Sequence, residues 1–238
     1  MVAYSKHAPM PSAVTVGNSD GIGLALTRLL VDKGWRVVGF SRRPSSVASS
    51  GYTHHTADVC SPDYPELLSS ALSALERVDV CVYCAGIGEF LDIETLHRER
   101  QVFETNLLGA VSSAQVVIPR MVRAGRGQFI GLSSQADAMV DSNAPSYAAS
   151  KAALSSYLEG LSLACRPRGV RVTNLRLGFV DTKMAKGRHR PFMVSRVQAA
   201  RRIWRCIQKR PMRDTYPKRM AVLLWMLRVG QRVRNWLD

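Results

Sequence analysis

Short apolar runs alternate with helix-length segments along most of the sequence. Six runs have the length and composition of buried strands: Ser12–Val16, Trp35–Phe40, Tyr52–Ala57, Val78–Cys84, Phe129–Leu132 and Val170–Leu175. Helical stretches lie between them, at Gly21–Asp32, Tyr64–Leu75, Arg98–Val122 and Ser146–Cys165. Strands that alternate with helices form βαβ units, in which helices cover both faces of a parallel sheet. Because 238 residues fit one hydrophobic core, the sequence predicts a single α/β domain with a doubly wound parallel sheet.

A glycine-rich turn links the first predicted strand to the first predicted helix. It reads Gly17-Asn18-Ser19-Asp20-Gly21-Ile22-Gly23, with the spacing G-x-x-x-G-x-G. Glycines in such a turn let the backbone approach a pyrophosphate, whose charge then faces the helix N-terminus. The turn favours a Rossmann-like, dinucleotide-binding fold. The alternative is that these glycines close an ordinary strand-to-helix turn that binds no ligand.

The residues that follow the second and third strands indicate which dinucleotide binds. Ser41-Arg42-Arg43 follows the second strand and contains no acid. NAD sites place an acid there for the ribose hydroxyl, whereas NADP sites need cations for the 2′-phosphate, which arginine binds through two hydrogen bonds. The sequence therefore favours NADP(H), with Arg42 ahead of Arg43, although Asp20 adds an opposing negative charge. Asp58 and Val59, after the third strand, are further candidate cofactor contacts. Asp58 could accept from the adenine amine, and the alternative is that it is an ordinary loop aspartate.

Two residues at the start of a predicted helix have the spacing of an acid–base pair. Tyr147 and Lys151 are four residues apart and so share one helix face. A tyrosine with an ordinary pKa of about 10 is a poor acid at neutral pH, and a nearby ammonium lowers that pKa by stabilising the phenolate. We therefore expect Lys151 to lower the pKa of Tyr147.

Two further polar residues belong to the same candidate site. Ser134 follows the strand Phe129–Leu132, where its hydroxyl can donate to a substrate oxygen at the carboxyl edge of the sheet. Asn106 lies inside the apolar helix Arg98–Val122, and a buried amide there needs partners. Asn106 either satisfies a local backbone kink or holds a water in a proton path, and the two roles are compatible.

The combined pattern resembles the short-chain dehydrogenase/reductase family over roughly residues 12–182. In that family a G-x-x-x-G-x-G turn, an N-A-G segment and an Asn–Ser–Tyr–Lys tetrad occur in this order. They fall here at Gly17/Gly21/Gly23, Ala85-Gly86, Asn106, Ser134, Tyr147 and Lys151.

The resemblance implies a role for each matched residue. Tyr147 would be the general acid or base, and Ser134 would polarise the reacting oxygen. Lys151 would hold the nicotinamide ribose, and Asn106 would position a relay water. In the segment Leu177–Thr182, Val180 and Thr182 would contact the nicotinamide carboxamide, and Gly178 is a further cofactor-binding position. An arginine after the second strand marks NADP(H) preference in the family.

The sequence departs from the family pattern at several positions. Tyr83-Cys84 replaces the two asparagines that usually precede Ala85-Gly86, so their side-chain hydrogen bonds must come from elsewhere. Leu177 replaces a proline, and Val16 replaces a threonine. The final strand and Gly-Gly segment of many members are not evident after Arg213–Tyr216.

The positive charge is concentrated at the C-terminal end. Residues 183–238 contain 16 Lys/Arg and two Asp/Glu, which gives +14 of the net charge of +15. We therefore divide the domain into a dinucleotide-binding and catalytic body, residues 1–182, and a basic end, residues 183–238. The segment Lys183–Arg190 matches the mobile substrate loop of the family. Its charge suits an anionic substrate, such as an acyl group on a carrier protein or coenzyme A, or is simply solvated.

A second part of the basic end has helical periodicity. Its apolar positions are Val222, Trp225, Met226, Val229, Val233, Trp236 and Leu237, with Arg228, Arg232 and Arg234 on the remaining surface. A basic amphipathic helix that contains tryptophan suits an anionic membrane surface. The alternative is that the helix packs on its own domain or in an oligomer interface.

The sequence thus predicts an NADPH-dependent enzyme that reduces a lipophilic or carrier-bound 3-oxoacyl or polyketide-like ketone to a secondary alcohol. We expect a homodimer or homotetramer. The alternative is a non-catalytic dinucleotide sensor whose basic tail docks a partner or membrane, but a sensor has no need of the intact tetrad. Nucleic acid ranks last because no recognition motif accompanies the charge.

The remaining composition predicts the compartment. Five scattered cysteines do not form a disulfide framework, and residues 1–11 contain no apolar signal segment. We expect a cytoplasmic protein, peripheral at the inner membrane face if the tail binds lipid. The histidines have no metal-ligand spacing, so we expect no metal.

Overall fold

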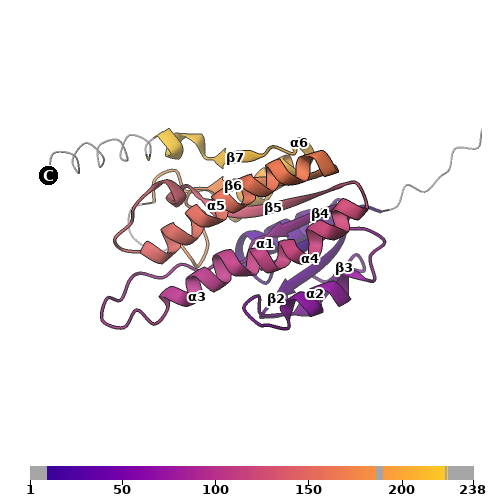
Figure 1. The fold of residues 1–238 in the computed structure, drawn as a ribbon, viewed down its shortest axis with the longest axis horizontal. Helices are drawn as coiled ribbons and strands as arrows, with labels where there is room; N and C mark the ends of the chain where they lie inside the picture. Colours follow the sequence, from indigo (N-terminus) through magenta and orange to yellow (C-terminus); the bar gives the residue numbers. More distant parts are fainter. Residues whose placement is uncertain (1–9, 186–189, 223, 225–238) are drawn as a thin grey trace, which may run out of the picture.

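The computed structural model describes residues 10–185, 190–222 and 224, and it confirms the α/β doubly wound fold. Within these residues, seven strands form one parallel sheet in the order β3-β2-β1-β4-β5-β6-β7 (Figure 1). The strands are β1 Ser12–Val16, β2 Arg36–Ser41, β3 Tyr52–Thr56, β4 Val80–Tyr83, β5 Gly127–Ser134, β6 Val170–Leu177 and β7 Arg213–Tyr216.

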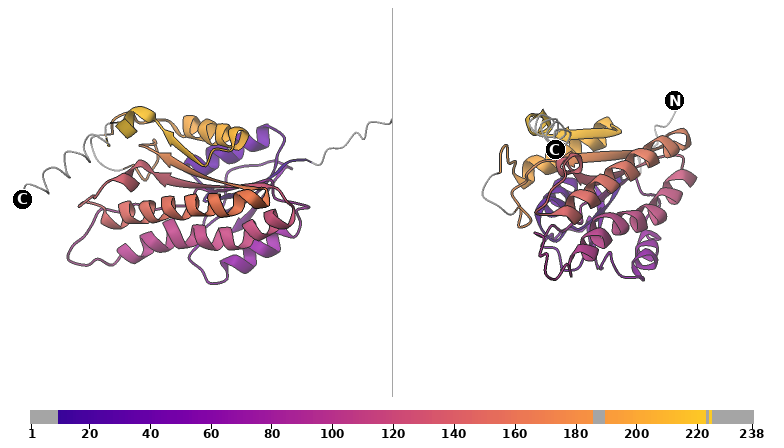
Figure 2. Two further views of the ribbon diagram at one scale, coloured as in Figure 1. Left: turned by 45° about the horizontal axis from the view of Figure 1, so that its top comes forward. Right: turned by 60° about the vertical axis from the view of Figure 1, so that its left-hand side comes forward.

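Helices cover both faces of this sheet (Figure 2). They are α1 Gly21–Asp32, α2 Tyr64–Leu72, α3 Glu99–Phe103, α4 Gly109–Arg123, α5 Pro145–Cys165 and α6 Arg196–Lys209. Shorter turns are the π-helical η1 Glu104–Leu108 and the 3-10 turns η2 Gln135–Ala138 and η3 Arg166–Arg168. Helices α1 and α6 bury one apolar cluster against the sheet, and α2, α4 and α5 bury the other. The site therefore stands on a sheet that is rigidly held from both sides.

Two elements of the basic end were not predicted from the sequence. Strand β7 is polar because Arg213 and Asp214 leave it no apolar run, and it pairs with β6. Asp214 forms an ion pair with Arg202 of α6, at 2.5 Å between Oδ2 and Nε. This pair joins the two unpredicted elements, and β7 extends the sheet formed by the preceding residues.

The stretch predicted as one helix over Arg98–Val122 is divided by a π-helical turn. The phenol of Tyr83 donates a hydrogen bond of 2.5 Å to the carbonyl of Thr105 in this turn. A Cβ on Gly109 would lie 2.3 Å from that phenol oxygen, so glycine is needed where α4 begins. Tyr83, which replaces a family asparagine, thus supports the end of β4 by a different contact.

The sheet reverses its strand order between β1 and β4, and the loops after these two strands touch. A Cβ on Gly17 would lie 2.5 Å from the backbone nitrogen of Ala85. In doubly wound sheets ligands bind at this reversal, beyond the carboxyl ends of the strands. The fold therefore places the glycine turn and Ala85-Gly86 at the expected ligand site.

Two predictions for the basic end lie outside the described residues. They are the centre of the substrate loop, residues 186–189, and the amphipathic helix from Trp225 onward. Both stay predictions. Across residues 10–185, 190–222 and 224, no helix is long and apolar enough to cross a membrane.

Candidate active site

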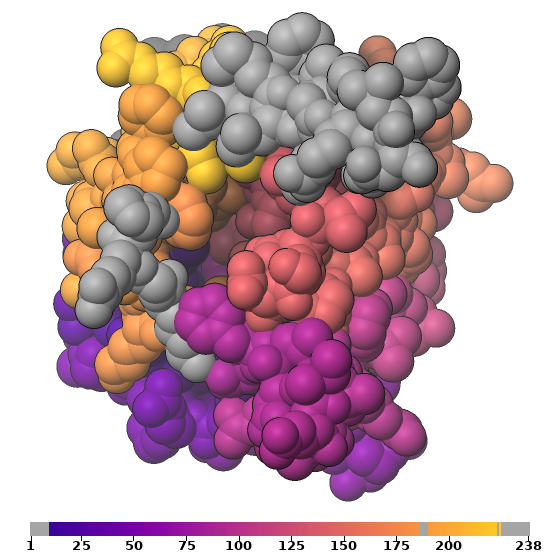
Figure 3. Space-filling model, turned by 90° about the vertical axis from the view of Figure 1, so that its left-hand side faces the viewer, coloured from indigo at the N-terminus to yellow at the C-terminus, as the bar shows by residue number. Residues whose placement is uncertain are grey.

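A cavity of about 810 Å³ opens at the carboxyl ends of the strands. Figure 3 shows its opening as a hollow in one face of the molecule. Most of the predicted site residues line this one cavity: Gly17, Ser19, Asp20, Gly21, Ile22, Gly23, Ser41, Arg42, Arg43, Asp58, Val59, Ala85, Gly86, Ser134, Tyr147, Lys151, Gly178, Val180 and Thr182. The two predicted residues that do not line it are Asn18 and Asn106, which are both fully buried.

The glycine turn presents the N-terminus of α1 to the cavity. Asp20 caps this helix by accepting a 2.7 Å hydrogen bond from the backbone nitrogen of Gly21. Its other carboxylate oxygen lies 2.8 Å from the Lys183 ammonium, and a hydrogen bond from Lys183 holds the pKa of Asp20 below its ordinary value. The opposing charge expected from Asp20 is therefore compensated by the first residue of the basic end.

Asn18 supports the phosphate side of the cavity instead of lining it. Its amide nitrogen donates to the phenol of Tyr52 at 2.7 Å, and its amide oxygen accepts from the Ser41 hydroxyl at 3.3 Å. Ser41 precedes Arg42 and Arg43, whose exposed side chains line the cavity. The Asn18 side chain thus joins the glycine turn to the arginine loop, and the prediction of Asn18 as a cofactor ligand stays a prediction.

Ser134, Tyr147 and Lys151 converge from two elements. Ser134 is the last residue of β5, and the other two lie in the first turns of α5. The Lys151 ammonium donates a 2.9 Å hydrogen bond to the carbonyl of Leu132 in β5, and it lies 5.8 Å from the ring centroid of Tyr147. The local spacing that suggested a catalytic group therefore does bring the three side chains to one end of the cavity.

Burial, rather than Lys151, dominates the pKa of Tyr147. Burial raises this pKa above its ordinary value, and a hydrogen bond with the Ser134 hydroxyl opposes the rise. Burial also lowers the pKa of Lys151 to about 8. The expectation that Lys151 lowers the pKa of Tyr147 is thus wrong for the chain by itself. The phenol stays protonated at neutral pH, which is the form that a proton donor needs.

Asn106 clamps the loop that follows β4. Its amide oxygen accepts from the backbone nitrogen of Ile87 at 2.8 Å, and its amide nitrogen donates to the Ile87 carbonyl at 2.9 Å and to the Ser150 hydroxyl at 3.0 Å. The π-helical turn points this amide at both partners. The Asn106 amide therefore satisfies the backbone of the loop after β4 rather than a kink in its own helix. The relay water stays a prediction.

Sequence reasoning missed an apolar group at the substrate end of the cavity. Its members are Phe90, Met139, Val140, Met184, Met220 and Leu224. Val140 is 88% exposed and Phe90 is 57% exposed, so large apolar side chains stand at the rim. The available signal was their position, because each follows one of the strands β4 to β7 on its carboxyl side. This apolar group is called the apolar rim below.

Comparison with known proteins agrees with this geometry. A family model described as short chain dehydrogenase matches residues 11–191. The chain belongs to this short-chain dehydrogenase family. Such proteins are oxidoreductases that use a nicotinamide dinucleotide and act on CH–OH or C=O groups of small molecules.

Individual relatives of this dehydrogenase extend the comparison. The chain is 34% identical to a 1-deoxy-11-beta-hydroxypentalenate dehydrogenase from Streptomyces exfoliatus, over 76% of this chain and 71% of the relative. It is 27% identical to a 3-oxoacyl-(acyl-carrier-protein) reductase from Vibrio cholerae, over 73% and 75%. A short-chain dehydrogenase structure from Streptomyces avermitilis superposes with a TM-score of 0.82 at 23% identity, covering 96% of each chain.

The buried Lys151 makes a prediction about stability and pH. Its pKa is about 8 in the folded chain, against an ordinary 10.5. Between these values the unfolded chain binds more protons, so the free energy of unfolding contributed by Lys151 rises with pH. Below pH 8 both states are protonated and the contribution is constant.

We therefore expect the free energy of unfolding of the wild type, minus that of Lys151→Met, to rise by ~2 kcal/mol from pH 7.5 to pH 9.5. Urea denaturation of both proteins at the two pH values measures this difference. Equal differences at both pH values would show that the ammonium is not buried as described.

Proposed function

We propose that the chain is an NADPH-dependent reductase that converts a lipophilic ketone to a secondary alcohol. The observation that carries this proposal is the shared cavity. One end of it is lined by Arg42 and Arg43, and the other by Ser134, Tyr147 and the apolar rim. A dinucleotide whose 2′-phosphate binds the arginines would therefore extend to the other end of the cavity. There it would meet an apolar substrate beside a protonated phenol.

The residues of the cavity fit a dinucleotide. The backbone from Ser19 to Gly23 at the start of α1 would hold the pyrophosphate. Arg42 would bind the 2′-phosphate, Asp58 and Val59 would contact the adenine, and Lys151 would hold the nicotinamide ribose. Val180 and Thr182, with Gly178 in the turn before them, would face the carboxamide. When bound, the nicotinamide supplies the hydride for the carbonyl carbon.

Ser134 and Tyr147 would act on the substrate oxygen. The Ser134 hydroxyl oxygen already accepts from the backbone nitrogen of Ala136 at 3.1 Å, which leaves its proton for donation to the substrate. Removing one such donor typically costs an enzyme ~3–4 kcal/mol of transition-state stabilisation. The Tyr147 phenol then gives its proton to the oxygen, completing the alcohol. Burial supports this direction because it keeps the phenol protonated.

The apolar rim favours a lipophilic substrate over an anionic one. Lys183, the first cation of the predicted substrate loop, is already engaged by Asp20. Large apolar side chains such as Phe90, Val140 and Met184 line the opening. The similarity to a 3-oxoacyl-(acyl-carrier-protein) reductase keeps an anionic, carrier-bound substrate as the second candidate.

A panel of ketones distinguishes the two candidates. We expect NADPH oxidation with neutral ketones, including steroids and N-acetylcysteamine 3-oxoacyl thioesters, at KM values that fall as the apolar part grows. Val140→Ser should raise the KM of the best neutral ketone by up to ~10-fold, because burying a valine contributes about 1.5 kcal/mol or more. Ile93→Ser is the matched control, since Ile93 is 78% exposed but does not line the cavity.

Turnover of coenzyme A thioesters alone would instead favour the anionic substrate. NADPH binding without turnover of any ketone would contradict the reductase and favour the dinucleotide sensor.

Replacing Arg42 tests the choice of cofactor. A charge-assisted hydrogen bond contributes about 1.5–3 kcal/mol, so Arg42→Ala should raise the KM for NADPH by roughly 10-fold to 100-fold and leave the KM for NADH nearly unchanged. Arg43→Ala should have the smaller effect. Arg36→Ala, an exposed arginine at the amino end of β2, is the control. Equal KM increases for both cofactors in Arg42→Ala would refute a 2′-phosphate contact.

A further inference from the structure

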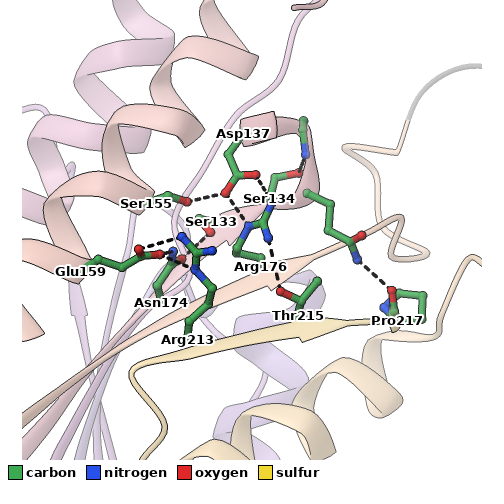
Figure 4. A network of polar contacts seen from close by, with 12 residues as sticks. Ser133, Ser134, Asp137, Ser155, Glu159, Asn174, Arg176, Arg213, Thr215 and Pro217 are labelled. Atoms are coloured by element: carbon green, nitrogen blue, oxygen red, sulfur yellow. Dashed lines mark hydrogen bonds and ion pairs between the residues drawn. The ribbon is translucent and has the colours of Figure 1, made fainter. Parts of the chain in front are cut away.

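A buried carboxylate joins the turn that carries Ser134 to two other elements. Asp137 lies in η2, directly after the last residue of β5. The guanidinium of Arg176 in β6 binds both of its oxygens, with Nε at 2.6 Å from Oδ2 (Figure 4). The same Oδ2 accepts a hydrogen bond of 2.6 Å from the Ser155 hydroxyl of α5. The side chains of Asp137 and Arg176 are only 6% and 15% exposed.

This carboxylate links the two elements that supply the reacting groups. The η2 turn begins at Ser134, whose hydroxyl oxygen caps it through the backbone nitrogen of Ala136. Ser155 lies one helical turn beyond Lys151 on α5, the helix that also carries Tyr147. Because Ser134 and Tyr147 come from different elements, their separation depends on contacts of this kind.

A second branch of the network reaches the cavity wall. Arg176 Nη1 lies 3.4 Å from the hydroxyl of Thr215 in β7, and the amide of Gln135 donates to the Pro217 carbonyl at 3.1 Å. Met220 of the apolar rim follows a few residues later. The serine turn is therefore held against β7 and the rim as well as against α5.

Stability alone does not account for a charge pair at this place. A buried ion pair can often be replaced by apolar side chains of similar volume without loss of stability. What apolar side chains cannot reproduce is a set of directed hydrogen bonds from one carboxylate to β6 and α5 at once. The geometry of the Asp137 carboxylate therefore points to alignment rather than to stability.

We propose that Asp137 is a positioning residue for the reduction. Together with Arg176 and Ser155 it holds the η2 turn so that the Ser134 hydroxyl and the Tyr147 phenol address the same substrate oxygen. Asp137 does not line the cavity, so it acts through Ser134 and not on the substrate. This inference rests on the proposed function and adds a residue to its machinery.

The test removes both charges together, so that neither is left buried without a partner. Asp137→Leu/Arg176→Met is compared with the matched control Asp214→Leu/Arg202→Met. The control pair is also bidentate and is 15% and 17% exposed. It joins α6 to β7, and in the described part of the chain its side chains form no hydrogen bond with those of Ser134, Asp137 or Arg176. Misplacement of a reacting group by about 1 Å can cost roughly 100-fold in rate.

We expect the Asp137→Leu/Arg176→Met variant to lose about 10-fold to 100-fold in kcat, with the KM for NADPH within about 2-fold of wild type. The control should keep kcat within about 2-fold, even if urea denaturation shows that it is equally destabilised. A folded test variant with wild-type kcat, or a control with the same loss of kcat, would overturn the proposal.

Two further measurements keep the inference separate from the proposed function. Hydrogen exchange of the backbone amides of residues 135–138 needs no substrate, and we expect faster exchange in the test variant and not in the control. If the wild type reduces no ketone, the proposed function fails while this exchange still decides whether Asp137 holds the turn. Should the double variant not fold, Ser155→Ala takes its place, and we expect it to lose less kcat than the double variant. If Ser155→Ala leaves both kcat and the amide exchange of residues 135–138 unchanged, the proposal is contradicted.

Discussion

The hydrogen bond from the buried Lys151 ammonium to the Leu132 carbonyl fixes helix α5 against strand β5. Ser134 is two residues beyond Leu132, and Tyr147 is one helical turn before Lys151, so this contact sets the spacing between the Ser134 hydroxyl and the Tyr147 phenol. Burial lowers the pKa of Lys151 and raises that of Tyr147. The chain by itself therefore holds a protonated phenol beside a lysine that is still mostly an ammonium at neutral pH.

The fold and the residues that face the cavity follow largely from local sequence. The first strand and helix begin and end where the apolar pattern predicts, and the glycine turn and the Tyr147–Lys151 spacing place their side chains in the cavity. Strand β7 was not predicted from the sequence because it has no apolar run. Its residues Arg213 and Asp214 instead form ion pairs with other elements. A polar strand can be recognised only once its partners are known.

The roles of polar residues whose partners are distant in the sequence were harder to predict. Asn18 and Asn106 have the residue type of ligands, yet Tyr52 and Ile87 bind them as supports. No spacing rule shows those contacts. The same holds for Tyr83, which supports the π-helical turn where the family has an asparagine. The site is thus a cavity that local motifs line, held in shape by contacts that only the folded chain shows.

The central claim is that the Tyr147 phenol delivers the proton to the substrate oxygen. The most direct measurement is the kcat of Tyr147→Phe for ketone reduction, together with its Kd for NADPH from a fluorescence titration. General acid catalysis contributes about 100-fold to 10,000-fold, so we expect kcat to fall by at least 100-fold while Kd stays within about 2-fold. A variant that binds NADPH normally and keeps wild-type turnover would contradict the account.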